Sequence, residues 1–376
     1  MSQPAPMDLA VLNAAEILNA LPEGAYITDV TRRILFWNKA AERITGWSAA
    51  EVIGRTCFDN ILCHVDKDQH QLCGKEYCPL HRSIITGQPS EAPLLVYAKA
   101  RTGLRIPVEV TVSPLRDTAG KVVGGVELFR DASEAVAEMN RAKVIQENAL
   151  RCPLPEDPRI SFAMRYLPRD LVGGDFYRVE HTKGSHYAVW AADVAGHGVS
   201  SALYTMQLRA LWEDLRPEFA RPSRIFTAMN RRVRAIAPEE GYFATAVYFS
   251  IDAATGRMTY ARAGHPAPMI LRADGSLQWL EEGGPALGML DDVDYTEHQA
   301  ELAPGDQLLV YTDGAVEIDD LQGHQLGLPG LQRLLGECLV AGVPDLEALE
   351  ERLLAYSGCV HLPDDITLIR VSRPRA

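Results

Sequence analysis

Short apolar runs separated by turn-forming residues organise the first third of the chain. Two of them, at residues 25–29 and 34–37, have the length and composition of strands, and a helix is predicted over 40–45. Ser48, with Glu51 three residues later, forms a capping-box pattern that predicts another short helix. Three further strand-like runs read APLLVYAKA, RIPVEVTVSPLRD and KVVGGVELFRD. This pattern predicts a small antiparallel sheet with short helices in front of it.

Residues 131–150 contain neither glycine nor proline, which predicts a continuous helix. Its approximate heptad seam consists of Val136, Met139, Lys143 and Leu150, with Ala135, Ala142 and Ala149 beside it. The spacing fits either a signalling helix that pairs with its copy in a homodimer or a solvated linker helix. Three prolines in CPLPEDPRI then end the helix.

Longer apolar runs follow residue 160. Four of them predict strands: HYAVWAADV, YFATAVYFSID, RMTYARAG and DQLLVYTDG. The segment from Ser200 to Arg216 is apolar on more than one face, which predicts a largely buried helix. Ser223 is the predicted N-cap of a second helix, and a third is expected over 346–356. Two antiparallel sheets with helices outside them would accommodate this pattern, so the whole chain is predicted to be of the α+β class.

Length and charge restrict the classes of function. The 376 residues suggest two or three domains, and the formal net charge of −13 argues against nucleic acid or an anionic membrane surface as a partner. No apolar run approaches the ~18 residues of a membrane-spanning helix, and the first residues lack the pattern of a signal peptide. These features predict a cytoplasmic protein. The seven cysteines, an odd number, do not indicate a disulfide framework.

Aspartates stand beside apolar, strand-like runs in the second half of the chain: Asp175, Asp193, Asp313, Asp364 and Asp365. A carboxylate at the end of a buried strand loses hydration unless it is paired or binds a cation. No lysine or arginine stands beside each of them, and Mg²⁺ or Mn²⁺ prefers oxygen ligands. Two such ions about 4 Å apart can activate a water molecule and hold a phosphoryl group. A single aspartate before glycine is usually only a turn former, so the hypothesis depends on the whole set.

The N-terminal motifs resemble those of a known sensor domain. The segments GAYITD, ILFWNKAAERITGWSAAEVIGR and PVEVTVSPLRDTAGKVVGGVELFRDAS are similar to those of PAS domains over residues 12–132. The resemblance implies an antiparallel sheet with short helices. It implies no particular ligand, because PAS domains bind many cofactors or none.

The C-terminal motifs resemble those of metal-dependent serine/threonine phosphatases, and more closely those of the bacterial SpoIIE-like branch. They are LVGGDFY, ADVAGHGVSSAL, FATAVYFSID, ARAGHPAPMIL, LLVYTDGAVE and DDITLIRV, in this order. The resemblance covers residues 160–373 and leaves 133–159 as signalling helix and linker. It implies an α/β/β/α sandwich of the PPM type, with a dinuclear Mn²⁺ or Mg²⁺ centre between the sheets.

The same resemblance implies a role for each matching residue. Asp193 bridges the two metal ions, and the carbonyl of Val194 helps to hold one of them. Asp313 and Asp364 bind the other ion, and Asp175 acts mostly through metal-bound water. Hydrolysis of the phosphate then requires no covalent nucleophile on the protein.

Some positions leave alternatives open. Asp365 either substitutes for Asp364 or orients it. His197 has a pKa suited to proton donation to a leaving alkoxide, but it follows the bridging aspartate less closely than in eukaryotic relatives. The alternative is that His197 shapes the turn and the start of the helix. His265 is expected to be a packed loop histidine, and Arg178 stands where many relatives carry an acid.

Four cysteines lie in one short segment of the N-terminal domain: Cys57, Cys63, Cys73 and Cys78, with His64, His70 and His81 among them. Four thiolates in a loop can hold an iron–sulfur cluster or zinc. Two of them can form a reversible disulfide that senses redox state. The spacing matches no standard metal signature, so the cysteines are alternatively small buried hydrophobic residues.

Together these features predict a sensor-regulated phosphatase that hydrolyses phosphoserine or phosphothreonine. The resemblance implies a phosphorylated regulatory protein of the anti-anti-sigma type as the substrate partner. Two alternatives remain: a non-catalytic signalling scaffold with a phosphatase fold, and a redox or metal sensor that acts through the cysteine-rich domain.

Overall fold

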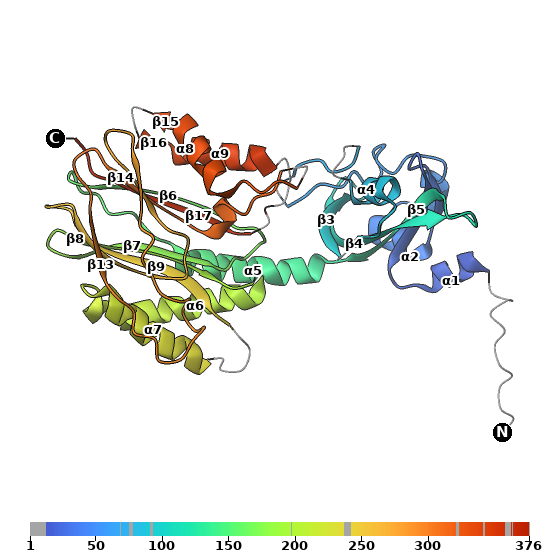
Figure 1. Cartoon of the computed structure of the whole chain (residues 1–376). Coiled ribbons are helices and arrows are strands. Elements are labelled where there is room, and N and C mark those ends of the chain that lie inside the picture. The colour runs from blue at the N-terminus through green and yellow to red at the C-terminus, as the bar shows by residue number, and fades with distance from the viewer. Residues whose placement is uncertain are drawn as a thin grey trace, which may run out of the picture. The chain divides into compact units, whose positions relative to one another are not determined.

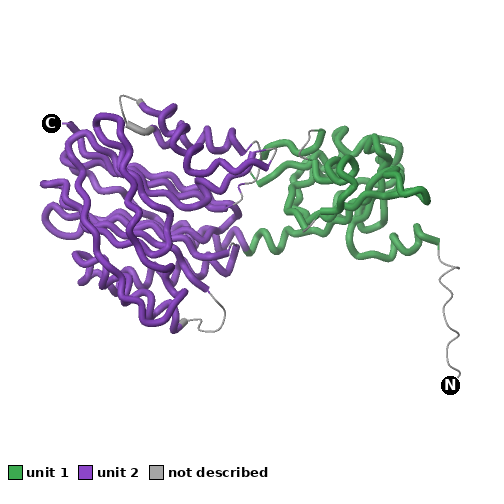
Figure 2. Tube along the Cα trace, viewed as in Figure 1, with its two compact units in different colours: residues 1–138 green, residues 139–376 purple. Residues whose placement is uncertain are grey.

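The computed structural model of the chain describes residues 13–67, 69–74, 78–90, 93–196, 198–236, 242–320, 323–340, 343–357, 362 and 364–375. The chain divides into two compact units, residues 1–138 and residues 139–376 (Figure 2). Among the described residues, no helix has both the length and the apolar character needed to cross a membrane.

Unit 1 is an antiparallel sheet with short helices beside it (Figure 1). The strand order is β2-β1-β5-β4-β3. Its elements are α1 (Ala14–Ala20), β1 (Gly24–Asp29), β2 (Ile34–Trp37), α2 (Lys39–Thr45), α3 (Ala49–Val52), α4 (Pro79–Thr86), β3 (Leu94–Lys99), β4 (Arg105–Arg116) and β5 (Val122–Asp131). The predicted antiparallel sheet and short helices are confirmed.

Local capping residues set the helices of unit 1. The side chain of Asn38 accepts hydrogen bonds from the N–H groups of Ala25 and Ala41, so it ties α2 to β1. Gly46 ends α2 with a φ of 76°, a left-handed conformation that favours glycine. The capping box of Ser48 and Glu51 is present at the start of α3, as predicted.

A single helix, α5 (Ser133–Leu150), follows the sheet of unit 1. The C-terminal part of the face predicted to be a dimer seam makes its contacts within the chain itself. Leu150 is 2% exposed and belongs to the core of unit 2, and Gln146 is 6% exposed. The large apolar residues left on the surface of α5 are Val144 and Ile145, which are 55% and 63% exposed.

Unit 2 contains two five-stranded antiparallel sheets, of order β13-β10-β9-β8-β7 and β12-β11-β14-β17-β6. Its strands are β6 (Ser161–Leu167), β7 (Asp175–Lys183), β8 (His186–Val194), β9 (Ala244–Asp252), β10 (Arg257–Ala263), β11 (Met269–Leu271), β12 (Leu277–Trp279), β13 (His298–Glu301), β14 (Gln307–Tyr311), β15 (Leu339–Val340), β16 (Val343–Pro344) and β17 (Ile366–Ser372). Its helices after α5 are α6 (Val199–Asp214), α7 (Pro222–Ile236), α8 (Gly327–Glu337) and α9 (Leu346–Ser357), with short 3-10 turns at Arg216–Glu218 and Asp313–Ala315.

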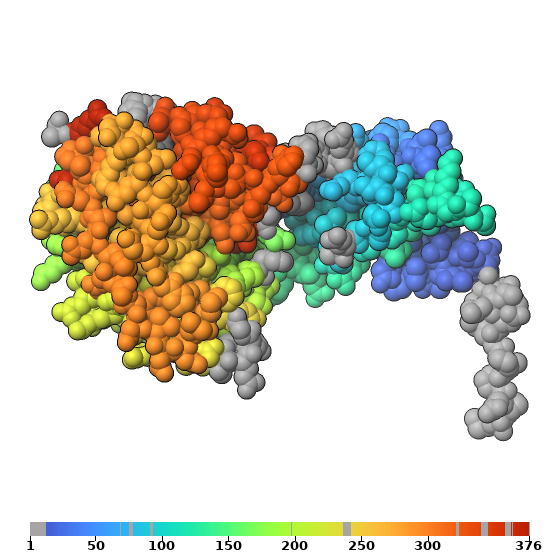
Figure 3. All heavy atoms as spheres, viewed as in Figure 1, coloured from blue at the N-terminus to red at the C-terminus, as the bar shows by residue number. Residues whose placement is uncertain are grey.

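The two sheets of unit 2 pack face to face between layers of helices. One buried core combines residues of both sheets, such as Trp190 and Phe249 from the first and Val310 and Ile369 from the second. Figure 1 shows α6 and α7 on the outer side of the first sheet and α8 and α9 on the outer side of the second. The orange and red segments that follow α7 cover most of the visible face of unit 2 (Figure 3). The predicted α/β/β/α sandwich is confirmed.

Two local predictions for unit 2 were wrong, and one helix was not predicted. Ser223 is not an N-cap, because α7 begins at Pro222, and its hydroxyl instead donates a hydrogen bond to Glu297. The helix α6 is not largely buried as predicted, since Leu203 is 63% exposed and Val199 is 46% exposed. The helix α8 was not predicted, because Pro329 and Gly330 near its start are weak helix formers.

Candidate functional site

Two aspartates face each other at one end of the first sheet of unit 2. Asp175 opens β7, and Asp193 lies directly opposite it near the end of β8. Cross-strand partners in an antiparallel pair project from the same face of a sheet. Asp175 is fully buried and Asp193 is 9% exposed, so two acidic groups share a poorly hydrated space.

The second sheet brings three more aspartates to the same place. Asp313 follows β14, whereas Asp364 and Asp365 precede β17. These strands are antiparallel, so the end of β14 lies beside the start of β17. The charges of all three raise the pKa of Asp193, which means that the acids of the two sheets lie within electrostatic range of one another. The five aspartates singled out in the sequence thus converge between the sheets.

Threonine hydroxyls hold Asp175 across the interface between the sheets. Its Oδ2 accepts hydrogen bonds from Thr312 Oγ1 at 3.0 Å and from Thr367 Oγ1 at 2.6 Å. Thr312 Oγ1 in turn accepts the backbone N–H of Thr367. Sequence reasoning missed both threonines, although each stands within two residues of an aspartate that it had singled out, in YTDG and DDIT.

The carboxylates of Asp365 and Asp364 differ in their hydrogen bonds to backbone groups. The two carboxylate oxygens of Asp365 accept the N–H groups of Arg169 and Gly174. The side chain of Asp364 accepts the N–H of Asp365 at 2.8 Å and remains half-buried. Asp365 therefore fastens the loop before Asp175 to the start of β17.

Burial and mutual repulsion raise the pKa values of this cluster. Burial, followed by the charges of Asp313, Asp364 and Asp365, raises the pKa of Asp193 to about 8. Burial and then the charge of Asp193 raise the pKa of Asp175 well above its ordinary range. Burial raises the pKa values of Asp313 and Asp365 to about 6. The cluster is thus a concentration of negative charge in a medium that solvates it poorly.

The positive side chains nearby are engaged elsewhere. In the part of the chain that the structure describes, Arg169 pairs with Asp170 and Arg165 pairs with Glu347. Nor do three or more His, Cys, Asp or Glu side chains form a ready-made cation site among the described residues.

The donor set nevertheless fits hard divalent cations. Among the described residues, two buried oxygens of the cluster, Asp175 Oδ1 and Asp313 Oδ1, have no hydrogen-bond partner. An unpartnered buried carboxylate oxygen is costly, and Mg²⁺ and Mn²⁺ prefer ligands of this kind. The cluster has the composition and the unmet bonding capacity of a divalent metal site.

Close backbone approach explains the two glycines before Asp175. A Cβ atom at Gly173 would lie 2.1 Å from the hydroxyl of Tyr166 and 2.4 Å from Asp365 Oδ2. A Cβ at Gly174 would lie 3.0 Å from the carbonyl oxygen of Val194. The glycines therefore allow the loop to pack against the carboxylates and against that carbonyl.

A residue of α5 also contacts this loop, and sequence reasoning missed it because no local pattern marks it. Gln146 Nε2 donates to the carbonyl of Gly173 at 2.7 Å and to Thr205 Oγ1 at 3.0 Å. The N–H of Gly173 donates back to Gln146 Oε1 at 3.1 Å. The helix that follows the N-terminal domain is thus hydrogen-bonded to the segment that precedes Asp175.

The structure places His265 and Arg178 away from a catalytic role, and it does not describe His197. His197 lies outside the described residues, and the flanking Gly196 and Gly198 have φ values of 90° and 83°. His265 is 1% exposed and shares a hydrogen bond of 2.9 Å with Thr245, and burial lowers its pKa to about 3. Arg178 donates to the backbone carbonyls at the end of α5 rather than to the carboxylates.

Three of the four clustered cysteines of unit 1 lie together. Cys57, Cys73 and Cys78 are each at most 2% exposed. Each of these three thiols lies within electrostatic range of the other two. The thiol of Cys63 instead donates to the carbonyl of Phe58 at 3.2 Å. The prediction of an iron–sulfur cluster or zinc bound by all four gains no support from this arrangement.

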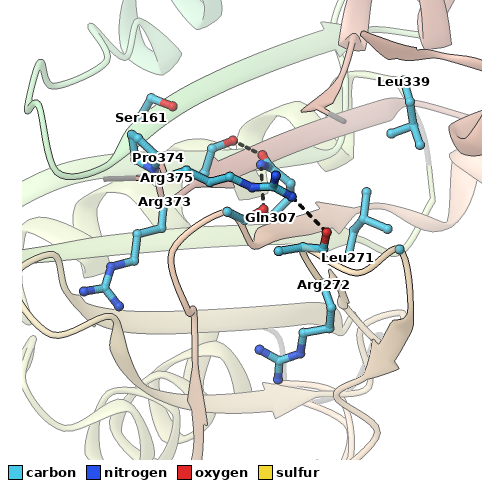
Figure 4. Close-up of a pocket in the computed structure, with 12 residues that line it drawn as sticks. Ser161, Leu271, Arg272, Gln307, Leu339, Arg373, Pro374 and Arg375 are labelled. Atoms are coloured by element: carbon cyan, nitrogen blue, oxygen red, sulfur yellow. Dashed lines mark hydrogen bonds between the residues drawn. The ribbon is translucent and has the colours of Figure 1, made fainter. Parts of the chain in front are cut away.

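A pocket of about 420 Å³ lies at the opposite end of the second sheet of unit 2 (Figure 4). Ser161, Gln307 and Ser372 line it, and strand length places them roughly 15 Å or more from Asp313. The arginines that border it donate to groups of unit 2 itself: Arg272 to Asp306, Arg373 to the carbonyl of Leu302 and Arg375 to the carbonyl of Ala273. This pocket is therefore separate from the carboxylate cluster.

Comparison with known families matches both halves of the chain. The profile described as PAS fold matches residues 13–132. The profile described as Stage II sporulation protein E (SpoIIE) matches residues 183–374. The predicted order of a PAS domain followed by a SpoIIE-like domain is confirmed.

Two relatives come from Bacillus subtilis (strain 168). Phosphoserine phosphatase RsbP is 29% identical over 183 residues, which are 48% of this chain and 45% of RsbP. Phosphoserine phosphatase RsbU is 25% identical over 308 residues, which are 81% of this chain and 88% of RsbU. The match therefore spans less than half of RsbP.

A solved structure shares the fold of unit 2. The SiaA-PP2C domain of Pseudomonas aeruginosa superposes with a TM-score of 0.55 at 25% sequence identity. The alignment covers 64% of this chain and 97% of that domain.

Proposed function

This chain belongs to the Stage II sporulation protein E (SpoIIE) family, and on that premise we propose that it is a sensor-regulated, metal-dependent protein serine/threonine phosphatase. The observation that carries the proposal is the convergence of Asp175, Asp193, Asp313 and Asp364 from two sheets. A non-catalytic scaffold has no need of such a cluster, because buried acids that repel one another destabilise the fold. The relatives RsbP and RsbU, both phosphoserine phosphatases, support the same reaction class.

The proposed metal ligands are the carboxylates of Asp193, Asp313 and Asp364 and the carbonyl of Val194, with Asp175 behind them. Two Mg²⁺ or Mn²⁺ ions would supply a water molecule activated for attack on phosphorus and would offset the charge of the phosphoryl oxygens. Asp364 suits ligation better than Asp365, because both oxygens of Asp365 already accept backbone N–H groups.

Other residues of the chain would position these groups. Thr312 and Thr367 fix one oxygen of Asp175 and leave its other oxygen without a partner among the described residues. Gly174 leaves space for the carbonyl of Val194. We propose His197 as the proton donor to the leaving seryl oxygen, with a purely structural role in the glycine turn as the alternative.

The proposed substrate is a phosphoserine or phosphothreonine on a regulatory protein of the anti-anti-sigma type. The active groups lie between sheets and next to loops, which suits a phosphorylated side chain presented by a partner. PAS domains are sensor modules, so we propose that the N-terminal domain regulates this hydrolysis.

The proposal is tested by hydrolysis of an aryl phosphate and of a phosphoserine protein, with and without Mn²⁺. We expect turnover that depends on Mn²⁺ and that falls roughly 100-fold or more in Asp193→Asn and in Asp313→Asn, because each change removes a charged ligand. Asp294→Asn, at an exposed position of unit 2, is the matched control and should retain full turnover.

The melting curve of each variant separates chemistry from folding. Replacing one member of a repelling cluster relieves repulsion, so neither variant should melt at a lower temperature than the parent. Full turnover in both variants would refute the assignment of the carboxylates. A parent chain that binds Mn²⁺ by calorimetry, yet hydrolyses neither substrate, would favour the scaffold.

A further inference from the structure

One tyrosine on the second sheet of unit 2 packs against the first sheet beside the carboxylates. Tyr166, on β6, lies directly opposite Thr367 of β17, and cross-strand partners project from the same face of a sheet. Thr367 donates to Asp175 from that face. The ring of Tyr166 packs against that of Tyr177, on β7, with the ring centroids 5.3 Å apart. Tyr166 therefore lies between the two sheets, at the end that carries the aspartates.

The hydroxyl of Tyr166 lies against the loop before Asp175. A Cβ atom at Gly173 would lie 2.1 Å from the Tyr166 hydroxyl and 2.4 Å from Asp365 Oδ2, so both oxygens border the same small space. The ring of Tyr166 is partly exposed, but its hydroxyl oxygen is buried and has no hydrogen-bond partner among the described residues. An unpartnered buried hydroxyl is costly. A phenylalanine would pack equally well, so the packing of the ring does not explain the hydroxyl.

The Tyr166 hydroxyl is a hydrogen-bond donor within a cluster of acceptors. Burial, followed by the charges of Asp365 and Asp175, raises the pKa of Tyr166 well above its ordinary value, so the group keeps its proton. Asp175 Oδ1 also lacks a partner among the described residues, because Thr312 and Thr367 both donate to Oδ2. One water molecule can accept a hydrogen bond from a hydroxyl, donate one to a carboxylate and bind a cation through its other lone pair.

We propose that Tyr166 is a positioning residue of the metal site, an inference that rests on the proposed function. Its hydroxyl donates a hydrogen bond to a water molecule that also contacts Asp175 Oδ1 and belongs to the shell of a bound Mg²⁺ or Mn²⁺ ion. Mg²⁺ usually keeps several of its water molecules in protein sites. Asp365 is the poorer acceptor for this hydroxyl, because both of its carboxylate oxygens already accept backbone N–H groups.

The test compares Mn²⁺ binding by the metal-free full chain and by its Tyr166→Phe variant in isothermal titration calorimetry. The variant keeps the ring and loses only the hydroxyl. We expect its Kd for Mn²⁺ to rise at least about fivefold, the effect of one lost hydrogen bond. Without metal the variant should melt no lower than its parent, because it removes an unpartnered buried hydroxyl. Weaker Mn²⁺ binding at undiminished stability is a result that a merely structural role would not produce.

Tyr187→Phe is the matched control, since it removes a tyrosine hydroxyl that has a partner within the fold. The Tyr187 hydroxyl donates to Asp157 Oδ2 at 2.7 Å. The length of β8 places Tyr187 roughly 20 Å from Asp193. We expect this variant to keep the parental Kd for Mn²⁺ while it melts at a lower temperature, which is the reverse of the pattern expected for Tyr166→Phe.

The possible failures of this test can be told apart. If the parent chain binds Mn²⁺ and Tyr166→Phe binds it with the parental Kd, the role of Tyr166 is overturned and the proposed function stands. A lower melting temperature of metal-free Tyr166→Phe would also overturn the role, because the hydroxyl would then make its hydrogen bond within the fold itself. A parent chain that binds no Mn²⁺ would overturn both the role of Tyr166 and the proposed metal site.

Discussion

At the residue scale, the carboxylate of Asp175 is held by hydroxyl groups rather than by positive side chains. Thr367 and Thr312 donate to the same oxygen, Oδ2, from the second sheet of unit 2. Hydroxyl donors orient a carboxylate without neutralising it, so its negative charge stays available to a cation. The two threonines thus help to explain how a fully buried acid can still serve a metal site.

Thr367→Val removes the shorter of these hydrogen bonds while it keeps the volume of the side chain. We expect turnover to fall roughly tenfold or more, because a hydrogen bond to a charged group contributes about 1.5–3 kcal/mol. Calorimetric titration with Mn²⁺ should show weaker binding as well. Thr118→Val, at an exposed turn of unit 1, is the control and should change neither quantity. Weaker stability with unchanged Mn²⁺ affinity would contradict the positioning role.

Glu127 is a buried acid of a different kind, in the sheet of unit 1. Burial, followed by the charge of Cys78, raises its pKa from an ordinary 4.5 to about 8, although a hydrogen bond from Tyr26 acts in the opposite direction. His64 also faces it, with Nε2 3.7 Å from Glu127 Oε1, and burial lowers the pKa of this histidine to about 4. At neutral pH the folded state therefore holds a proton on Glu127 that the unfolded chain has released.

This difference makes stability depend on pH in a definite direction. Between pH 4.5 and about 8 the folded state binds more protons at Glu127 than the unfolded state does, so the contribution of this residue to stability falls as pH rises. Glu127→Gln removes the dependence. In calorimetry of the full chain, the variant should match its parent near pH 5 and exceed it near pH 8 by an amount on the order of a few kcal/mol. The control variant Glu134→Gln, at an exposed site, should match the stability of its parent at both pH values. If the free energy of unfolding of Glu127→Gln differed from that of its parent by the same amount at every pH, a protonated Glu127 in the folded state would be contradicted.

At the element scale, α5 is tied to the loop before Asp175 through Gln146. Gln146→Leu would leave the buried N–H and carbonyl of Gly173 without this partner, and such a loss costs about 1–3 kcal/mol. We expect a lower melting temperature together with a reduced kcat, because Gly173 leads into Asp175. Asn140→Leu, at an exposed position of the same helix, is the control and should keep the parental kcat. A variant that melts early but turns over at the parental rate would limit Gln146 to a structural role.

The helices and strands also show which features could be predicted from sequence patterns and which could not. The strand at residues 34–37 and the capping box at Ser48 were predictable, because a short apolar run and a capping pattern are signals within a few residues of sequence. The five aspartates could be suspected of sharing a cation site from their places beside apolar runs, but only the family resemblance assigned their roles, since Asp175 and Asp365 are far apart in the chain. Gln146 gave no signal, because a glutamine on a helix is usually solvated. The helix α8 was missed because the packing of its apolar face, not its glycine-rich composition, stabilises it.

At the scale of the whole molecule, the predicted homodimer through α5 stays a prediction, but its contact face needs revision. Leu150 of the predicted seam is buried in the core of unit 2, and Gln146 on the same face is buried too. A second copy could pair there only by displacing contacts within the chain. Val144 and Ile145 are the large apolar residues of α5 that remain exposed for pairing.

Ile145→Glu tests this revised face, because it places a charge on an apolar surface that pairing would bury. We expect light scattering to give the molar mass of a dimer for the parent chain and of a monomer for the variant, with equal melting curves for the two at low concentration. Asn140→Glu introduces the same charge at a polar exposed position of α5 and should remain dimeric. A parent chain that is monomeric at every concentration would remove the dimer. A variant that is as dimeric as its parent would place the contact elsewhere on the molecule.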